Sequence, residues 1–471
     1  MMRENPADLA PELCVLAGAV LGLLTGIFLP RARQWIAVVI CAAGLVAGLA
    51  CTVIASRRPD LMAFGAFTVD PLTHLTRGVV LGATSLVLGL AAGPLRGHAR
   101  ETEFSVLTLL AALGTITLGA SSDLLVLVAA YLLASIPGYA LAGFGKDAPG
   151  TEAALKYYLM GAFMGIFMLA GVTLLYGLGR ATSYEPLRQG LATAPGAAVT
   201  VGAVALLAGL LLKAGAVPAH YWVPDVTEGA PPVVAAFVTT VPKIGAFTAL
   251  FRLAAEALPS TVNRPLLIAV IATVTMTLGN LAAFGQDNVR RLLAYSTISQ
   301  AGYLLVPVAM AGRAALAEPA LLFYLAAYAV TNLGAFAVVV AAGRDTIAGY
   351  TGLARRSPAL ALALAVCLLG LVGTPPTAVF VGKLLMFGSA LQGGYAWLAV
   401  VAALNSVASV FYYLRWIVPA FGRPPEPDPG PHSEPYSGPP VTLRRGAQAV
   451  AYTAATASLA LGVASGIALT V

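Results

Sequence analysis

Residues 210–243 read LLLKAGAVPAHYWVPDVTEGAPPVVAAFVTTVPK, an almost wholly apolar stretch that nevertheless carries two lysines, Lys213 and Lys243. Each lysine lies in an apolar run long enough to cross a bilayer, and each is close to a helix-breaking residue. An ammonium group at that depth is costly, so it marks a functional site by default. The stretch therefore predicts a transport site inside a membrane domain.

The composition of the whole chain agrees with a membrane protein. The 471 residues are 59% hydrophobic and 10% charged, whereas about a quarter of the residues in a soluble domain are charged. Lipid offers the backbone no hydrogen-bond partners, so the spans must be helices or a closed barrel. Long uninterrupted apolar runs favour helices, and the sequence predicts an all-α polytopic membrane protein.

The apolar runs divide the chain into fourteen predicted spans, on the basis that one crossing needs about 20 apolar residues. The seventh span abuts Pro218 and the twelfth contains Pro375 and Pro376, so we expect both helices to be broken. The predicted spans are residues 13–29, 35–55, 70–92, 103–119, 121–144, 151–178, 196–217, 231–256, 264–284, 290–312, 317–342, 358–388, 393–421 and 443–469.

The spans suggest an internal repeat. Spans four to eight and nine to thirteen are two sets of five, and an odd number per set would invert the second set relative to the first. A breaker and a lysine fall late in each set, at Lys213 and at Lys383, as is typical of transporters with discontinuous helices. We predict four parts: a three-helix segment over 1–100, repeats over 101–258 and 259–422, and a proline-rich linker with a final helix over 423–471.

Loop cations predict the orientation, because Lys and Arg are enriched on the cytoplasmic side. One set of alternate loops holds thirteen of them: Arg31, Arg33, Arg96, Arg100, Lys146, Arg290, Arg291, Arg344, Arg355, Arg356, Arg423, Arg444 and Arg445. The other holds eight: Arg3, Arg57, Arg58, Arg180, Arg188, Arg252, Arg264 and Arg313. We therefore expect both termini on the outside.

The sequence gives no indication that this chain binds a redox group or nucleic acid. The four cysteines lie inside apolar runs without a CxxC pattern and are interpreted as small core residues, so no cluster, haem or flavin is expected on this chain. Topology-setting loop cations explain the net charge of +7 without nucleic acid. No phosphate-binding loop or catalytic triad motif is present.

The lysines are the strongest candidates for chemistry. The chain has 22 arginines, mostly in loops, but four of its five lysines, Lys156, Lys213, Lys243 and Lys383, lie within predicted spans. Arginine keeps its proton, whereas a desolvated lysine can release it, so buried lysines suit a proton relay. The alternative is snorkelling to the headgroups. It suits Lys156, near the start of its span, better than the two lysines deep in their runs.

Other polar residues near the broken seventh span allow two interpretations of their role. His220 titrates near neutral pH and suits a relay, but it equally suits a hydrogen bond to a broken helix end. Asp225 and Glu228 are predicted to cap the eighth span, with a direct proton role as the alternative. The Tyr and Trp residues near span ends are interpreted as anchors at the membrane interface rather than as quinone sites.

Five ordered segments resemble the antiporter-like membrane subunits of respiratory complex I, and among these subunit N, over nearly the whole chain. Two further features favour subunit N: residues 323–336 lack the His and Lys of the related subunits, and no amphipathic extension follows the last span. The segments are EAALKYYLMGAF (152–163), KAGAVPAHYWVPDVTEGAP (213–231), VPKIGAF (241–247), NLAAFGQDNVRRLLAYSTISQAGYLL (280–305) and GTPPTAVFVGKLLMF (373–387).

The resemblance implies roles for the motif residues. Lys213 would be the channel lysine of the broken seventh span, Lys243 the central lysine, and Lys383 the terminal lysine. Lys156 would match the sixth-span lysine, and His220 the histidine of the AVPxHxWxPD motif. Protons would move in response to quinone reduction elsewhere in the complex.

The resemblance also implies partners and a location. NADH, FMN, Fe–S clusters and quinone would be bound by other subunits, with antiporter-like subunit M and small subunits K, J and A as neighbours. Because the alanine-rich, arginine-over-lysine composition is typical of a GC-rich bacterium, the expected location is the bacterial cytoplasmic membrane.

Two positions depart from the family pattern. The glutamate that normally precedes the fifth-span proline by five residues is Leu132, and the histidine of a later motif is Gln300. Lys213 therefore lacks its family counter-ion. Either another acid replaces it, Glu152 or one from a neighbouring subunit, or this half of the channel is attenuated.

Two alternatives stay open. The chain could serve a Mrp-type cation/proton antiporter or a membrane-bound hydrogenase, which use the same fold without NADH. It could also be a structural subunit that no longer pumps.

Overall fold

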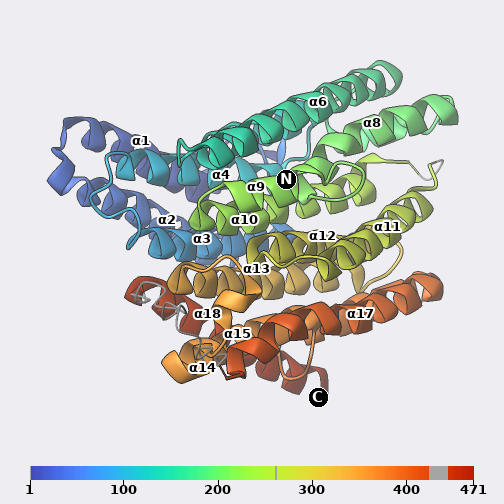
Figure 1. The fold of residues 1–471 in the computed structure, drawn as a ribbon. Helices are drawn as coiled ribbons and strands as arrows, with labels where there is room; N and C mark the ends of the chain where they lie inside the picture. Colours follow the sequence, from blue (N-terminus) through green and yellow to red (C-terminus); the bar gives the residue numbers. More distant parts are fainter. Residues whose placement is uncertain (1, 260–261, 424–443, 471) are drawn as a thin grey trace, which may run out of the picture.

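Long apolar helices make up most of the structure, a computed structural model that describes residues 2–259, 262–423 and 444–470 (Figure 1). The helices are η1 Pro6–Leu9, α1 Ala10–Phe28, η2 Arg31–Arg33, α2 Trp35–Ala55, α3 Pro71–Ala91, α4 Glu101–Ala120, α5 Leu124–Ala142, α6 Ala148–Gly179, α7 Tyr184–Leu191, α8 Gly196–Ala214, α9 Trp222–Gly229, α10 Pro232–Arg252, η3 Leu253–Ala257, α11 Arg264–Phe284, α12 Val289–Ala309, α13 Ala317–Ala342, η4 Ile347–Tyr350, α14 Leu353–Arg356, α15 Pro358–Val372, α16 Ala378–Gln392, α17 Ala396–Phe421 and α18 Arg445–Thr470.

The predicted spans agree with these helices. Thirteen helices within the described residues are long and apolar enough to cross a membrane, and the shorter α15 and α16 flank the Pro-Pro break. The seventh span is broken as predicted, because α8 ends at Ala214 and α9 begins at Trp222. The all-α membrane fold is therefore confirmed. The predicted proline-rich linker falls largely on residues 424–443, outside the described residues.

Three short strands add to the helical fold near the N-terminus. β2 (Leu61–Ala63) pairs antiparallel with β3 (Phe67–Val69) and parallel with β1 (Met2–Arg3). These strands connect the loop between α2 and α3 to the chain start. The amino-acid sequence does not predict these strands, because each is too short for an alternating pattern of polar and apolar residues to be recognised.

The central helices are α10, α12 and α13. In the most apolar 18-residue segment of the span formed by α10 and η3, all residues are buried, whereas only 28% of the corresponding segment of α6 is buried. Small residues permit this close packing: a side chain at Gly245 of α10 would overlap the carbonyl of Thr115 on α4. Lys243 therefore lies on the most enclosed helix of the protein.

The two predicted repeats share two local structural features, a helix cap and an isolated β-bridge. Asp123 caps α5 and Asn288 caps α12, each by accepting two backbone N–H groups of the first turn. The same two caps form isolated antiparallel bridges, Asp123 with Ser183 and Asn288 with Thr346, just before the short helices that precede the broken spans. These matched features favour a repeated design, while the domain boundaries remain predictions.

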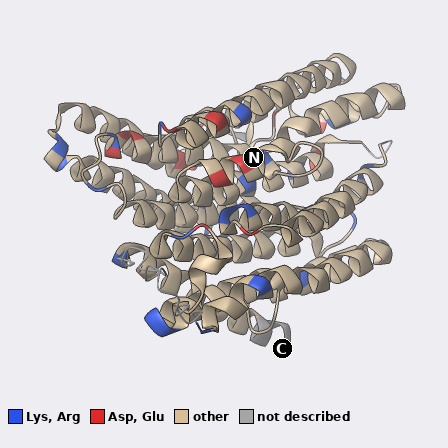
Figure 2. Cartoon of the chain, in the orientation of Figure 1, with Lys and Arg blue, Asp and Glu red and all other residues tan. Residues whose placement is uncertain are grey.

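Charged residues lie mostly at helix ends and in loops (Figure 2). Arg252 is an exception to its predicted loop position. It lies in the last turn of α10 with its side chain fully buried, where it binds Asp70 at 2.9 Å and Glu256 at 3.0 Å. The prediction that Arg252 lies in a loop is wrong: it lies within α10, and two carboxylates, at the start of α3 and in η3, allow it to be buried.

Candidate functional site

Lys213 lies in the last turn of α8, just before the break in the seventh span. Gly215 ends the helix in the left-handed conformation at φ 68°, which glycine adopts without strain. The buried Lys213 ammonium donates a hydrogen bond to the carbonyl of Ala134 at 3.1 Å. It also faces three tyrosine rings, of Tyr131, Tyr139 and Tyr157, with ring centres 5.6, 6.0 and 5.9 Å away.

Glu152, the candidate carboxylate partner on this chain, forms no ion pair with Lys213. Leu132, at the position where the resemblance predicts a glutamate, has a side chain that is 45% exposed on the outer face of α5. Glu152 pairs instead with Lys156, one turn further along α6. Within the described residues, no carboxylate lies within 4.0 Å of the Lys213 ammonium.

Lys243 lies midway along α10 and is 1% exposed. Its ammonium donates to the carbonyl of Thr297 on α12 at 2.9 Å. The Thr297 hydroxyl lies 3.0 Å from the hydroxyl of Tyr328, which donates to the carbonyl of Thr239 at 2.8 Å. Asn332 lies on the same side, where its amide donates to the hydroxyl of Thr240 at 2.8 Å. A connected set of neutral polar groups therefore extends from Thr297, the hydrogen-bond partner of Lys243.

Lys383 lies in α16, directly after the break in the twelfth span. Its ammonium donates to the carbonyl of Val372, the last residue of α15, at 2.8 Å, and to the Ser406 hydroxyl at 2.9 Å. The ring of Tyr303 lies 4.1 Å from it. The broken helix therefore supplies Lys383 with a carbonyl that the helix itself leaves unpaired.

The three buried lysines share one kind of environment: in the part of the chain that the structure describes, each binds a backbone carbonyl and none forms an ion pair. A carbonyl accepts a hydrogen bond from a charged ammonium and from a neutral amine alike. Such a site therefore tolerates both protonation states, which a group that receives and passes on a proton requires.

Lys156 differs from the other three lysines. Its side chain is 45% exposed and forms salt bridges with Glu152 at 2.7 Å and with Asp225 at 2.9 Å. Asp225 also contacts Arg291, which in turn binds Glu228 at 2.8 Å. The prediction that Asp225 and Glu228 cap the eighth span is wrong, because Pro231 precedes α10 and both carboxylates are engaged by cations from other helices.

His220 lies in the turn that joins α8 and α9 and is buried. Its Nδ1 has no hydrogen-bond partner among the described residues. The imidazole lines a cavity of about 380 Å³ together with Asp225, Arg291 and Tyr295. The structure thus brings His220 next to the charged cluster of Lys156, and the cavity connects the two.

Buried tyrosines and amides form further hydrogen bonds near the end of α15 and beside Lys383. Tyr324 donates to the Gln300 side-chain oxygen at 2.6 Å, and the Gln300 amide donates to the carbonyl of Leu371 at 2.8 Å. Ser406 joins Lys383 to the hydroxyl of Tyr303. Tyr303 and Tyr324 are fully buried and lie away from the span ends, so the interpretation of span-end tyrosines as interfacial anchors does not apply to them. Their distance from the ends of their apolar runs was a usable signal.

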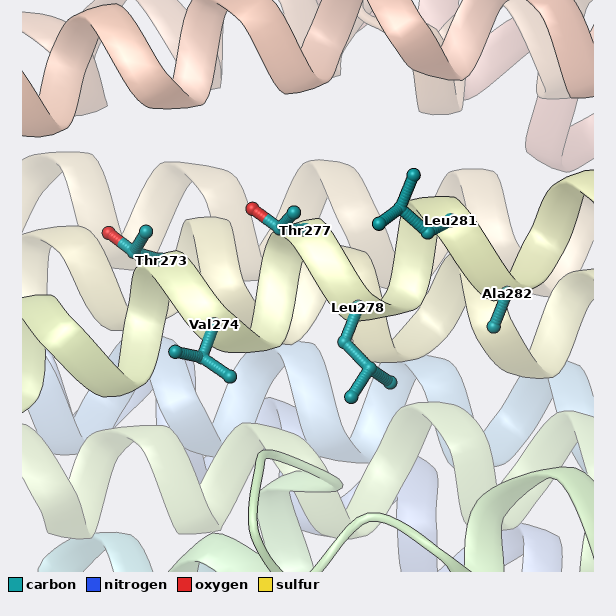
Figure 3. Close-up of a pocket in the computed structure, with 6 residues that line it drawn as sticks. All are labelled: Thr273, Val274, Thr277, Leu278, Leu281 and Ala282. Atoms are coloured by element: carbon teal, nitrogen blue, oxygen red, sulfur yellow. The ribbon is translucent and has the colours of Figure 1, made fainter.

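A second, larger cavity of about 560 Å³ lies along α11 and contains none of the predicted site residues. Figure 3 shows Thr273, Thr277 and Leu281 pointing to one side of the helix and Val274 and Leu278 to the other. Thr277 accepts a hydrogen bond from Asn405 on the neighbouring α17. The lining is largely apolar, as expected for a groove on a membrane-spanning helix.

Possible metal ligands do not gather anywhere in the described residues: no group of three or more His, Cys, Asp or Glu side chains is placed to hold an ion.

Known proteins are similar to this chain in both sequence and fold. The family profile for the transmembrane region of NADH:quinone oxidoreductases and Mrp antiporters matches residues 121–410. NADH-quinone oxidoreductase subunit N 1 of Streptomyces griseus is 54% identical over 99% of this chain and 98% of its own length, and subunit N of a Mycobacterium species is 49% identical over 98% and 97%.

Chains of solved structures also superimpose on this chain. A chain of respiratory complex I from Thermus thermophilus superimposes with a TM-score of 0.82 at 34% identity, covering 98% of both chains. A chain of the Mrp complex from Dietzia reaches a TM-score of 0.83 at 24% identity, covering 98% of this chain and 95% of its own length, which shows a shared fold. The chain thus belongs to the subunit N family of NADH-quinone oxidoreductase, the antiporter-like membrane subunits of respiratory complex I.

Proposed function

We propose that this chain conducts protons through Lys213, Lys243 and Lys383, driven by quinone reduction in other subunits. The observation that carries the proposal is the shared environment of the three lysines. Each ammonium is buried in a span and bound to a carbonyl that accepts from either protonation state. Burial without a counter-ion disfavours a permanent charge, so these lysines suit transient protonation.

The route begins, in this proposal, at the cavity that His220 lines. With the predicted orientation, the loop before α12 faces the cytoplasm, so Asp225 and Arg291 mark the cytoplasmic end of the cavity. His220 would then receive protons from this end and pass them towards Lys243. Removing the buried Arg252 from the count of outer cations leaves the excess on the cytoplasmic side, which supports both termini lying outside.

The central part of the route relies on hydroxyl and amide groups. Thr297 and Tyr328 lie beside Lys243, while Ser406 and Tyr303 lie beside Lys383. Gln300, at the position of the family's histidine, links Tyr324 to the end of α15. These groups are neutral, and they would orient water between the lysines while the lysines carry the charge.

The rest of the complex would supply the redox chemistry. We infer that NADH, FMN, the Fe–S clusters and quinone are bound by other subunits of a bacterial cytoplasmic-membrane complex, and that antiporter-like subunit M and the small subunits K, J and A are the neighbours. The 54% identity to a subunit N supports this over a Mrp antiporter, for which 24% identity supports only a common fold.

Replacement of Lys243 tests the proposal. In vesicles that contain the assembled complex, Lys243→Met should strongly reduce the protons pumped per NADH oxidised, because methionine fills the site without carrying a proton. Lys146→Met, at an exposed loop position, is the matched control and should pump normally. Unchanged pumping by Lys243→Met in fully assembled complex would leave a structural role as the better description of the chain.

A further inference from the structure

Lys213 poses a specific problem, because its charged form has no carboxylate partner among the described residues. The family position for that acid is Leu132, whose side chain lies on the exposed face of α5. The neighbouring residue Tyr131 is 2% exposed and turns inward. The inward face of α5 thus presents an aromatic ring, and not a carboxylate, to Lys213.

Three rings surround the ammonium. Tyr131 and Tyr139 come from α5 and Tyr157 from α6, and all three ring centres lie within 6.0 Å of the Lys213 Nζ. A cation within about 6 Å of an aromatic ring is attracted by the electron-rich face, and the attraction grows when the site is desolvated. The three rings and the carbonyl of Ala134 together enclose the ammonium with electron-rich but uncharged groups.

The surrounding structure fixes these rings. Tyr157 stacks on Trp222 with ring centres 4.1 Å apart, and the Trp222 indole N–H donates to the carbonyl of Leu212, the residue before Lys213. Tyr139 packs edge-on against Tyr157 at 4.7 Å. The rings are therefore tied to the same helix end that carries the lysine.

Gly161 on α6 makes room for the arrangement. A side chain at this position would overlap the ring and hydroxyl of Tyr139, and the Tyr131 hydroxyl donates to the Gly161 carbonyl at 3.4 Å. Gly177 on the same helix has open space around it. Glycine at 161 is thus needed for the position of the tyrosines, whereas glycine at 177 is not.

We propose that Tyr131, Tyr139 and Tyr157 form an aromatic cage that holds the protonated form of Lys213 in place of the missing carboxylate. The tyrosines are positioning residues that act through Lys213, and this inference rests on the proposed proton role of that lysine. Because the cage is uncharged, the charge at this site changes only when Lys213 gains or loses its proton. No ion pair has to open before the proton moves on.

The test compares substitutions that remove a ring with substitutions that keep it, in vesicles containing the assembled complex. Tyr157→Leu removes one ring and should lower the protons pumped per NADH, because the loss of one desolvated cation–π contact of about 2 kcal/mol shifts Lys213 about 30-fold towards the neutral amine. Tyr157→Phe keeps the ring and should restore pumping to near the wild-type value. Native gels would establish that equal amounts of complex are assembled.

The glycine pair provides a second measurement that leaves every tyrosine in place. Gly161→Ala should displace Tyr139 and reduce pumping, whereas Gly177→Ala should pump like the wild type. If Tyr157→Leu and Gly161→Ala both pump normally while Lys213→Met does not, the cage is overturned and the proton role of Lys213 stands. If Lys213→Met itself pumps normally, the proposed proton role fails at this site and the cage proposal fails with it.

Discussion

Gly215, at the end of α8, lies directly against the ammonium of Lys243 on α10: a Cβ at Gly215 would be 3.2 Å from the lysine Nζ. The break in the seventh span therefore does more than interrupt a helix. It brings the end of the segment that carries Lys213 next to the central lysine. In residues 210–243, Lys213 and the ammonium of Lys243 therefore both lie at the C-terminal end of α8.

Replacement of Gly215 by alanine should impair both folding and pumping. A non-glycine residue at φ 68° is strained by about 1–2 kcal/mol, and the added methyl group would crowd Val223 and Lys243. The expected result is a lower unfolding temperature of the complex together with reduced pumping per NADH. Gly343→Ala, with φ 62° and open space around it, is the control, and it should show the strain without the pumping defect.

Restoring the family's acid by Leu132→Glu should not raise the proton-to-electron ratio. The side chain of residue 132 lies on the exposed face of α5, and the inward position beside it is filled by Tyr131. A new carboxylate there would point away from Lys213. A ratio above the wild-type value, measured in the same vesicles, would show instead that the native channel is limited by the missing acid.

The ion pair of Arg252 with Asp70 should be essential for stability. Removing one partner of a buried pair typically costs about 3–5 kcal/mol, and Arg252 also binds Glu256, Thr73 and the carbonyl of Gly119. We therefore expect Arg252→Ala to reduce the amount of assembled complex on native gels. Arg188→Ala removes an exposed pair with Glu185 and should leave assembly unchanged.

The same pair predicts a pH dependence. Burial raises the pKa of Asp70, but the Arg252 guanidinium outweighs this and holds the pKa below its usual value. A carboxylate whose pKa is lowered in the folded state contributes stability at neutral pH and loses it as the pH falls below about 4. Thermal unfolding of Asp70→Asn should consequently depend less on acid pH than that of the wild type.

The fold could be predicted well from the sequence, because membrane spans are recognisable by their length and hydropathy. The eighth span was expected over 231–256, and α10 with η3 covers Pro232–Ala257. Prolines correctly marked both broken helices. Burial of Lys213, Lys243 and Lys383 followed from their depth in apolar runs.

The surroundings of the lysines were not predictable in the same way. In a wholly apolar helix no alternation of polar and apolar residues marks the inward face, so nothing in the sequence showed that Tyr131 turns inward and Leu132 outward. The ion-pair partners of Arg252 and Asp225 are not predictable from the sequence for a related reason. These partners lie on distant parts of the chain, and only packing brings them together.

The central claim is that protons pass through lysines that can lose their charge. The most direct test is Lys243→Arg in purified complex reconstituted into vesicles, with the protons pumped per NADH as the readout. Arginine keeps the positive charge and can donate hydrogen bonds, but it does not release its proton. The account predicts that Lys243→Arg pumps as poorly as Lys243→Met, and pumping at the wild-type ratio by Lys243→Arg would contradict it.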